Sequence, residues 1–120
     1  MKRESIDFIK DIIDSINDVE LFINGFDFDG FCQDRKTVYA VIRAIEIMGE
    51  AVKNITTKIR DENPLIPWKQ IAGMRDKLIH AYFGVDSIIL WKTAKEELPQ
   101  LKILFKKILE VEMMLNRPSD

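Results

Sequence analysis

The chain has 120 residues, 47% of them hydrophobic and 32% charged, so it is long enough for one domain with one hydrophobic core. A formal net charge of −2 and a pI near 5.5 exclude a protein that grips long nucleic acid by charge alone, so any contact with nucleic acid must be local. The single cysteine, Cys32, excludes an internal disulfide, and one cysteine with one histidine excludes a four-ligand zinc site.

Every apolar run is interrupted by charge within a few residues, and the first residues lack the pattern of a leader peptide. With the lone cysteine, these features predict a soluble protein of the cytoplasm that makes no membrane contact. No glycine-rich phosphate loop is present, so we expect no bound nucleotide cofactor. The expected organisation is a single helical domain over residues 1–116 and a short tail over residues 117–120.

The first predicted helix begins with Ser5 as its N-cap and presents one apolar stripe at helical spacing. Residues 24–31 follow as a predicted loop, and its glycines and phenylalanines suggest that aromatic rings fold it back onto the core. The stripe of the first helix consists of Ile9, Ile12, Ile13, Ile16, Val19 and Ile23.

Asp34 is expected to cap a long second helix that ends near Arg60 and would be roughly 40 Å long at ~1.5 Å per residue. Gly49 in its middle costs on the order of 1 kcal/mol relative to alanine, which suggests that another helix approaches closely there. Residues 61–67 form a predicted turn. The inner stripe of this helix consists of Val38, Val41, Ile42, Ile45, Met48, Val52, Ile55 and Ile59.

A third helix is predicted over residues 68–83, with Pro67 suited to its first position because the missing N–H is not needed there. Gly84 can end this helix in a left-handed conformation, and Asp86 can cap the next one. Pro99 should break or kink the fourth helix just before itself, because proline removes one backbone hydrogen bond and clashes with the preceding turn.

The last predicted helix has two apolar sides, one of which a lone bundle would leave uncovered, so dimerisation is the economical explanation. No strand-like alternation is present, and the fold class is therefore all-α, an antiparallel bundle of four to five helices that forms a homodimer or a higher oligomer. The main stripe consists of Leu101, Leu104, Ile108, Val111 and Leu115, and the second side of Ile103, Leu109 and Met113.

His80 is the only side chain of the protein with an unperturbed pKa near neutrality, so acid–base chemistry at pH 7 would most simply use it. The alternative is a surface histidine with no role. On a regular helix Ile71 and Tyr82 face the core, Arg75 lies near the edge of that face, and His80 lies opposite. A site that joins Arg75 to His80 therefore needs the reach of the arginine, a local distortion, or a second subunit.

Three other candidate residues, Tyr82, Glu46 and Glu50, can also be explained by a structural role. Tyr82 can be a half-buried aromatic residue with its hydroxyl at the rim of the bundle. Glu46 and Glu50 resemble the start of a di-metal helical site, but such sites need Glu-x-x-His pairs on two helices, and one histidine is too few. We therefore expect no metal there, and instead an ion-paired polar face that uses Arg43 and Lys53, with Arg75 as a further candidate partner.

The spacing Arg75-x4-His80-x-Tyr82 resembles the signature of HEPN ribonucleases of the HepT type, in which a polar residue directly follows the arginine. Residues 43–51 look like the family's long-helix segment, and residues 67–74 lead into the motif as in HepT-like proteins. The resemblance extends from the first helix into the last one. It implies a HEPN-like homodimer in which two motifs face a shared cleft, and a toxin role in a type VII toxin–antitoxin pair of the MntA–HepT kind.

The resemblance also implies a metal-independent endoribonuclease, with Arg75 on the phosphate and His80 moving the proton of a ribose 2′-hydroxyl. The substrate would be an RNA such as a tRNA or an mRNA. The supporting and RNA-contact candidates are Asp76, Lys77, Lys69, Arg43 and Glu46.

In the family that the chain resembles, an MNT-type nucleotidyltransferase antitoxin transfers AMP to the tyrosine at the position of Tyr82. Negatively charged nucleotides at the mouth of an RNA-binding cleft would repel phosphate and fill space. Two other readings stay open: a non-catalytic helical scaffold that docks a nucleotidyltransferase, and a helical oligomerisation protein with no partner.

Overall fold

The computed structural model describes residues 3–80 and 86–116, and within them every side chain except those of Arg75, Leu78, Ile79 and His80. These residues form helices and no strand, which confirms the predicted all-α class. In chain order the elements are α1 (Ser5–Ile23), α2 (Phe28–Gln33), α3 (Arg35–Lys53), α4 (Thr57–Glu62), α5 (Trp68–His80), α6 (Ser87–Lys92), the π-helical turn η2 (Thr93–Glu97) and α7 (Leu98–Leu115).

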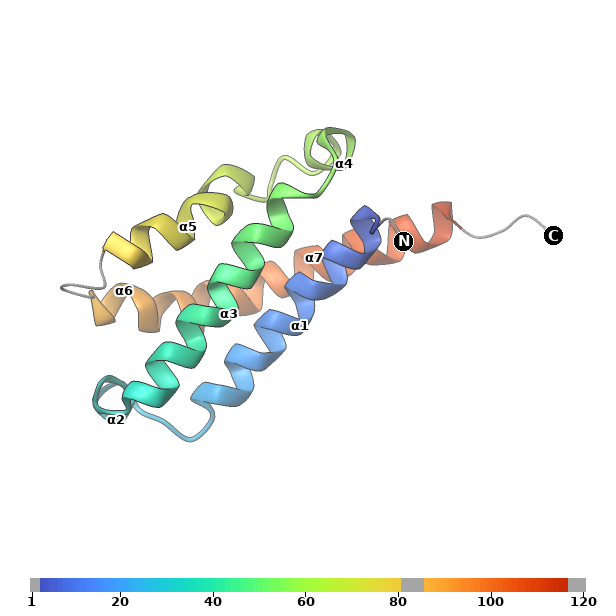
Figure 1. Cartoon of the computed structure of the whole chain (residues 1–120). Helices are drawn as coiled ribbons and strands as arrows, with labels where there is room; N and C mark the ends of the chain where they lie inside the picture. The colour runs from blue at the N-terminus through green and yellow to red at the C-terminus, as the bar shows by residue number, and fades with distance from the viewer. Residues whose placement is uncertain (1–2, 81–85, 117–120) are drawn as a thin grey trace.

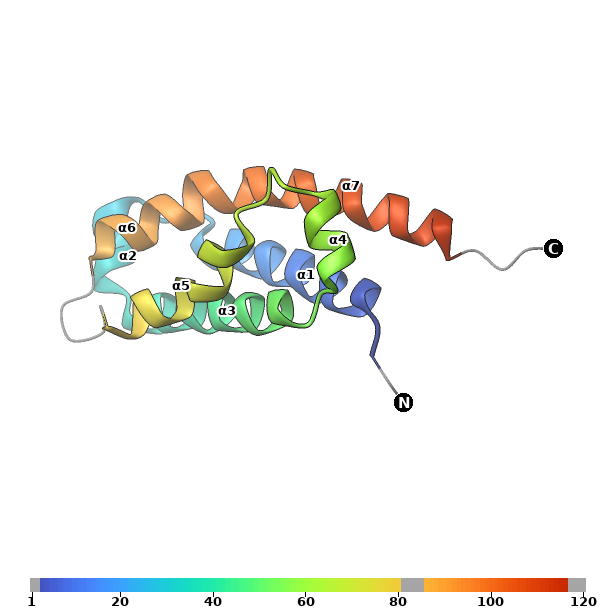
Figure 2. The same ribbon diagram turned by 90° about the horizontal axis from the view of Figure 1, so that it is seen from above.

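The helices form an elongated antiparallel bundle (Figure 1). α1 and α3 lie side by side and run in opposite directions, and α5 packs on α3 and runs back along it. α6, η2 and α7 follow one another as a single long rod, which lies on one side of the molecule with α3 on the other and α1 between them (Figure 2). The described residues thus contain four long helical segments, within the predicted four to five, and α2 and α4 are short helices in the connections. The molecule measures 54 × 29 × 27 Å along its principal axes.

The core lies where the apolar stripes of α1, α3 and the rod meet. All six stripe residues predicted for the first helix are buried, which confirms that helix and its orientation. Each buried aliphatic side chain contributes about 1.5–3 kcal/mol relative to its exposed state, so this stripe is a major source of stability. The largest fully buried side chains from the other elements include Phe31, Ile45, Met48, Leu90, Leu98 and Phe105.

The start of α1 differs from the prediction. Glu4, not Ser5, is the N-cap, and its backbone N–H donates to the carboxylate of Asp7 at 3.0 Å. The hydroxyl of Ser5 instead accepts the backbone N–H of Thr56 at 3.2 Å, which ties α1 to the segment before α4. The prediction was wrong because this hydroxyl is used by a residue far away in the chain.

The segment predicted as a loop contains a short helix, α2. Asp27 caps it, since its side chain accepts the N–H of Gly30 at 2.7 Å. The turn before it uses Gly25, whose φ of +85° favours glycine. The predicted packing of aromatic rings is confirmed for Phe31, which is fully buried, while Phe26 packs partly against the core.

The second predicted helix starts where expected but ends early. Asp34 caps α3, since its side chain accepts the N–H of Thr37 at 3.1 Å. The helix then ends at Lys53 instead of near Arg60, so it is roughly 28 Å long and not 40 Å at ~1.5 Å per residue. Gly49 is buried in it, and the predicted close approach of another helix there stays a prediction.

Polar side chains divide the predicted second helix into α3 and α4. The Asn54 side chain donates to the carbonyl of Glu50 at 2.9 Å and so closes the last turn of α3. Thr56 then caps α4 by accepting the N–H of Ile59 at 3.4 Å. Ile55 and Ile59 are nevertheless buried, so the apolar stripe continues through the break. Periodicity alone therefore could not show that the helix is interrupted.

The chain does not end its helix before Pro99, but the predicted irregularity is present, because a π-helical turn interrupts the α-helical pattern over Thr93–Glu97. Asp86 caps α6 as predicted, since it accepts the N–H of Ile89 at 3.3 Å. The rod then continues through η2, where the N–H of Leu98 bonds to the carbonyl of Thr93, five residues earlier. The wider π-helical turn accommodates a proline one residue later, so the chain bypasses the clash without ending the helix.

α7 is buried along its first half and exposed at its C-terminal end, which extends beyond the bundle (Figure 1). The predicted main stripe is right for Leu101 and Ile108 but wrong for Val111 and Leu115, which are exposed, and it left out Phe105, which is fully buried. The exposed large hydrophobic residues of α7 are Ile103, Val111, Met113, Met114 and Leu115.

This exposed set includes two residues of the predicted second apolar side, Ile103 and Met113. Homodimerisation stays a prediction. Among residues 3–80 and 86–116, no helix is both long and apolar enough to cross a membrane. The predicted tail over residues 117–120 and the predicted helix end at Gly84 lie outside the described residues.

Candidate functional site

The predicted motif lies at the C-terminal end of α5 and just after it. The backbone of Arg75, Asp76, Lys77 and His80 belongs to α5. The side chains of Arg75 and His80 lie outside the described residues, and so does all of Tyr82. The site is therefore described by the backbone of α5 and by the side chains that surround this helix.

The start of α5 is anchored in the core. The carbonyl of Pro67 accepts the N–H of Ile71 at 3.0 Å, and the indole N–H of Trp68 donates to the carbonyl of Asn63 at 3.0 Å. The Trp68 ring meets Phe105 of α7 edge to face, with ring centroids 5.6 Å apart. A capping turn and an aromatic pair thus fix where α5 begins, as the sequence predicted.

One side of α5 faces the core. Ile71 is 1% exposed, and Trp68 and Ala72 pack partly against the core. Residues three and four apart lie on the same side of a helix, and Arg75 follows Ile71 by four and Ala72 by three. The backbone therefore places position 75 on the side of α5 that packs into the bundle.

The other side of α5 faces solvent. Lys69 and Asp76 are exposed, and a Cβ added to Gly73 would meet nothing within 4 Å. Position 80 continues this series, since 69, 73, 76 and 80 are spaced by four, three and four residues. The backbone of α5 thus places positions 75 and 80 on different sides of the helix, and the roles of Arg75 and His80 stay predictions.

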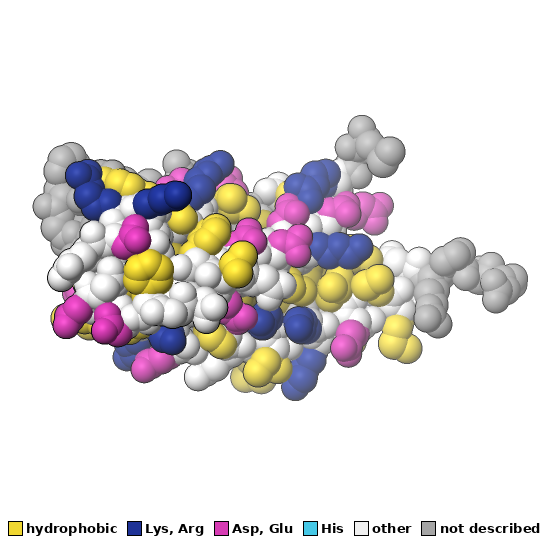
Figure 3. Space-filling view, turned by 90° about the horizontal axis from the view of Figure 1, so that it is seen from below, with side chains coloured by type: hydrophobic (Ala, Val, Ile, Leu, Met, Phe, Trp, Pro, Cys, Tyr) yellow, Lys and Arg dark blue, Asp and Glu magenta, His cyan; other side chains and the backbone are white. Residues whose placement is uncertain are grey.

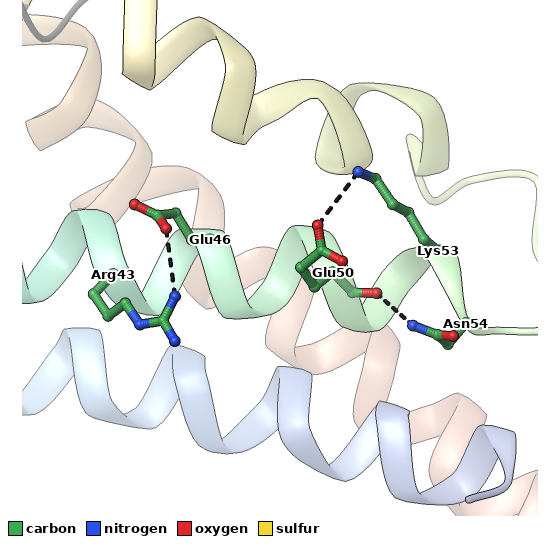
Figure 4. A network of polar contacts seen from close by, with 5 residues as sticks. All are labelled: Arg43, Glu46, Glu50, Lys53 and Asn54. Carbon is green, nitrogen blue, oxygen red and sulfur yellow. Dashed lines mark hydrogen bonds and ion pairs between the residues drawn. The ribbon is translucent and has the colours of Figure 1, made fainter.

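α3 presents a polar face next to α5 (Figure 4). Arg43 pairs with Glu46, Nη1 to Oε2 at 3.4 Å, and Lys53 pairs with Glu50, Nζ to Oε1 at 3.5 Å. Both carboxylates extend toward α5 in Figure 4. The predicted ion-paired face is confirmed for these two pairs, each worth about 0–1 kcal/mol at the surface. Pairing with Arg75 stays a prediction.

Glu46 and Arg43, the two members of one ion pair on α3, differ in exposure. The Glu46 side chain is 24% exposed and that of Arg43 is 71% exposed, so the carboxylate is sheltered while the guanidinium is largely in solvent. No group of three or more histidine, cysteine, aspartate or glutamate side chains within the described part of the chain is arranged to hold a metal ion. Glu46 pairs with Arg43 of its own helix, and an interaction of Glu46 with α5 stays a prediction.

Positive charge near α5 comes from single side chains. Lys69 and Lys77 are exposed, as is Asp76. On the opposite side of the molecule from α5, seen in Figure 3, basic side chains also lie in small groups separated by acidic and hydrophobic ones. An RNA contact would therefore be local, as the net charge of the sequence suggested.

A groove beside α5 was not predicted from the sequence. It lies between α5 and the rod, and it includes Gln70 and Gln100, which no motif marks. The residues that line it come from two separate stretches of the chain, 65–77 and 89–104, and the second stretch contains the π-helical turn. No sequence signal identifies such a set.

The protein is thus an all-helical bundle in which α5, the helix that carries the motif, packs on α3. The acidic residues of α3 form ion pairs with basic residues of the same helix. A family model described as Ribonuclease HepT-like matches residues 12–108. The chain belongs to this family of HepT-like ribonucleases.

Relatives support the same family over nearly the whole chain. A Thermococcus cleftensis protein named probable ribonuclease HepT is 52% identical over 90% of this chain and 98% of its own length. A Methanocaldococcus jannaschii protein whose name describes it as an RNase is 47% identical over 91% of this chain and 94% of its own length. A Caldanaerobacter subterraneus protein, also named as an RNase, is 47% identical over 75% of this chain and 80% of its own length. No solved structure matches the chain.

Proposed function

We propose that the protein is a metal-independent endoribonuclease and the toxin of a toxin–antitoxin pair. The observation that carries the proposal is the Arg75-x4-His80-x-Tyr82 spacing on and just after α5, in a chain of the HepT-like ribonuclease family. The names of the relatives support RNA as the substrate.

The reaction uses the substrate's own hydroxyl as the nucleophile. His80 accepts the proton of a ribose 2′-hydroxyl while that oxygen attacks the adjacent phosphorus. A bond forms between the 2′-oxygen and phosphorus, the bond from phosphorus to the 5′-oxygen breaks, and the leaving oxygen takes up a proton. Arg75 binds the phosphate and stabilises the additional negative charge of the transition state, for which a planar guanidinium is well suited.

Two copies of the chain form the site. Positions 75 and 80 lie on different sides of α5, so one helix alone does not bring both side chains to one phosphate. A homodimer, in which the motifs of two copies face a shared cleft, resolves this difficulty. The exposed apolar residues of α7 support association with another protein surface.

Tyr82 is the regulatory residue in this proposal. An MNT-type nucleotidyltransferase antitoxin transfers AMP from ATP to its hydroxyl: the tyrosine oxygen bonds to the α-phosphorus and pyrophosphate leaves. The added phosphate, two residues beyond His80, repels RNA from the cleft. Mass spectrometry of protein co-expressed with the nucleotidyltransferase should show the mass of one or more AMP groups, and the Tyr82→Phe protein should show none. Unmodified wild-type protein beside an active nucleotidyltransferase would contradict the regulatory part of the proposal.

The nuclease is tested with purified protein, total tRNA and EDTA. The wild-type protein should cleave RNA in the chelator, and the folded His80→Ala protein should be at least about 10²-fold slower, since positioned acid–base groups contribute that much or more. Equal activity of His80→Ala would end the catalytic proposal. Absence of cleavage under all conditions, with retained binding to the nucleotidyltransferase, would favour the non-catalytic scaffold.

A further inference from the structure

A groove with a volume of about 470 Å³ runs along α5, between this helix and the rod of α6, η2 and α7. Its size is in the usual range for small-ligand sites, and it is open to solvent at the surface. Lys77, two residues after Arg75, belongs to its lining. The groove therefore reaches the helical turn that carries the motif.

The two ends of the groove differ. α5 and the rod run in opposite directions (Figure 1), so Lys77 of α5 lies toward the same end as Ile89 of α6, and Pro67 lies toward the same end as Leu104 of α7. The end with Lys77 is the end nearest the motif. A ligand that extends from the groove toward position 80 must pass Lys77.

The floor of the groove is apolar. Ile71 and Leu101 are buried and Met74 is partly buried, and all three line the groove. A flat apolar surface with a polarizable sulfur suits the face of an aromatic ring, because thioether sulfur makes favourable contacts with aromatic groups. A nucleobase presents such a ring.

The rim of the groove is polar and suits the edge of a base. Gln70 and Gln100 are exposed residues of α5 and α7, and each side-chain amide carries both donors and an acceptor. Such amides match the donor and acceptor patterns of base edges. The hydroxyl of Thr93 already donates to the carbonyl of Ile89 at 2.8 Å, so this residue is part of the wall.

The charged residues of the groove would orient a bound nucleotide. Among the described residues that line the groove, Lys77 is the cation and Glu97 is the anion. A phosphate is attracted to the lysine and repelled by the glutamate, whereas a base amino group or a ribose hydroxyl can donate to the glutamate. A bound nucleotide would thus have its phosphate at Lys77, next to the motif, and its base farther along.

We propose that this groove binds one nucleotide of the RNA substrate next to the cleaved phosphodiester, with the base on the apolar floor and the phosphate at Lys77. The inference rests on the proposed ribonuclease function and deepens it, because it assigns base recognition to Gln70 and Gln100. The combination of amides, one cation and one anion around an apolar floor favours a nucleotide over the side chains of a protein partner.

Binding is measured with the full-length His80→Ala protein, which removes cleavage, and with labelled RNA oligonucleotides that differ in one base. Lys77→Ala should weaken binding of all of them by about tenfold, as expected for loss of a phosphate contact. Gln70→Ala with Gln100→Ala should weaken binding by about tenfold and reduce the preference among bases. Lys106→Ala and Gln33→Ala, exposed residues that do not line the groove, are the matched controls.

The methionine methyl groups provide a second readout by NMR. Titration with RNA should shift the methyl signal of Met74, which lines the groove, and leave that of Met114, at the exposed end of α7, unchanged. In the protein with an intact motif, the two glutamine changes should raise KM and alter the cleavage pattern, with kcat nearly unchanged.

Two outcomes overturn the inference. If wild-type protein cleaves RNA while the groove variants bind and cleave like the controls, the groove is not a nucleotide site although the ribonuclease proposal stands. If the groove variants change the oligomeric state without RNA and leave RNA affinity unchanged, a second copy of the chain occupies the groove. Absence of cleavage by the wild-type protein in EDTA would instead count against the proposed function itself.

Discussion

The α1–α3 pair and α5 are built differently. α1 and α3 each bury a long apolar stripe, and side chains cap the start of α3 and its end. In α5, among the side chains that are described, only Ile71 is fully buried, and one side of the helix carries exposed polar residues around the motif. Regions with few buried apolar contacts open and rearrange more easily, whereas packed helices hold position. We therefore expect the pair α1–α3 to contribute most of the stability and α5 to carry the residues of the proposed reaction.

The largest expected effect comes from Arg75 on α5. Arg75→Ala should lower the rate of RNA cleavage by about 10²–10³-fold, the loss typical of removing one charge-stabilising donor from a transition state. Arg75→Lys should recover only part of this loss, because an ammonium cannot bind a phosphate with two parallel hydrogen bonds. Rates are measured on a defined RNA, and urea unfolding shows whether each variant is folded. Wild-type rates in Arg75→Ala would remove this residue from the mechanism.

A change in the α1–α3 pair should instead affect stability. Ile45→Ala, at a fully buried position of α3, should lower the free energy of unfolding by about 2–5 kcal/mol, because it removes apolar contacts and leaves a cavity. Urea denaturation measures the loss. Leu21→Ala, at an exposed position of α1, is the control and should change stability by less than about 0.5 kcal/mol. Equal effects of the two changes would contradict the assignment of stability to the buried stripes of the pair.

Glu46 tests whether the two regions are coupled. Its sheltered carboxylate extends from α3 toward α5 (Figure 4), on whose packed side position 75 lies. If Glu46 positions the guanidinium of Arg75, then Glu46→Gln should lower kcat by about tenfold with little change in KM, since it weakens a charge-assisted hydrogen bond. Glu46→Asp should restore part of the activity. Glu110→Gln, an exposed residue of α7, is the control.

A rise in KM alone, or a loss of stability as large as the loss of activity, would show that Glu46 does not act through Arg75. In the first case it would contribute to RNA binding, and in the second it would be a structural residue of α3. Either result would separate the acidic face of α3 from the reaction.

The smallest effect is expected at the cap of α3. Asp34→Ala should lower the free energy of unfolding by about 1 kcal/mol, because the N–H of Thr37 loses its acceptor at 3.1 Å. Asp34→Asn should retain most of the stability, since an asparagine side chain can also cap. The rate of RNA cleavage by folded protein should stay unchanged. A clear loss of activity in Asp34→Ala would mean that the start of α3 also contributes to the site.

Local patterns made several parts of the fold predictable. The stripe of α1 follows from helical periodicity, and the caps at Asp34 and Asp86 depend on hydrogen bonds within a few residues. The division between the two sides of α5 is also local, because helical spacing places positions 75 and 80 once the helix is known. These features need no information from distant parts of the chain.

The sequence by itself thus determined the all-helical class, the core stripe of α1, the beginning of α5 and the spacing of the candidate motif. Only the tertiary structure decided that Ser5 bonds to Thr56, that the rod continues past Pro99, and that Gln70 and Gln100 line one groove. The physical reason is the distance along the chain over which each interaction acts. Periodicity and caps act over one or two helical turns, and periodicity does not distinguish a π-helical turn from a helix end at Pro99. The Ser5–Thr56 hydrogen bond and the groove depend on how segments far apart in the sequence pack together.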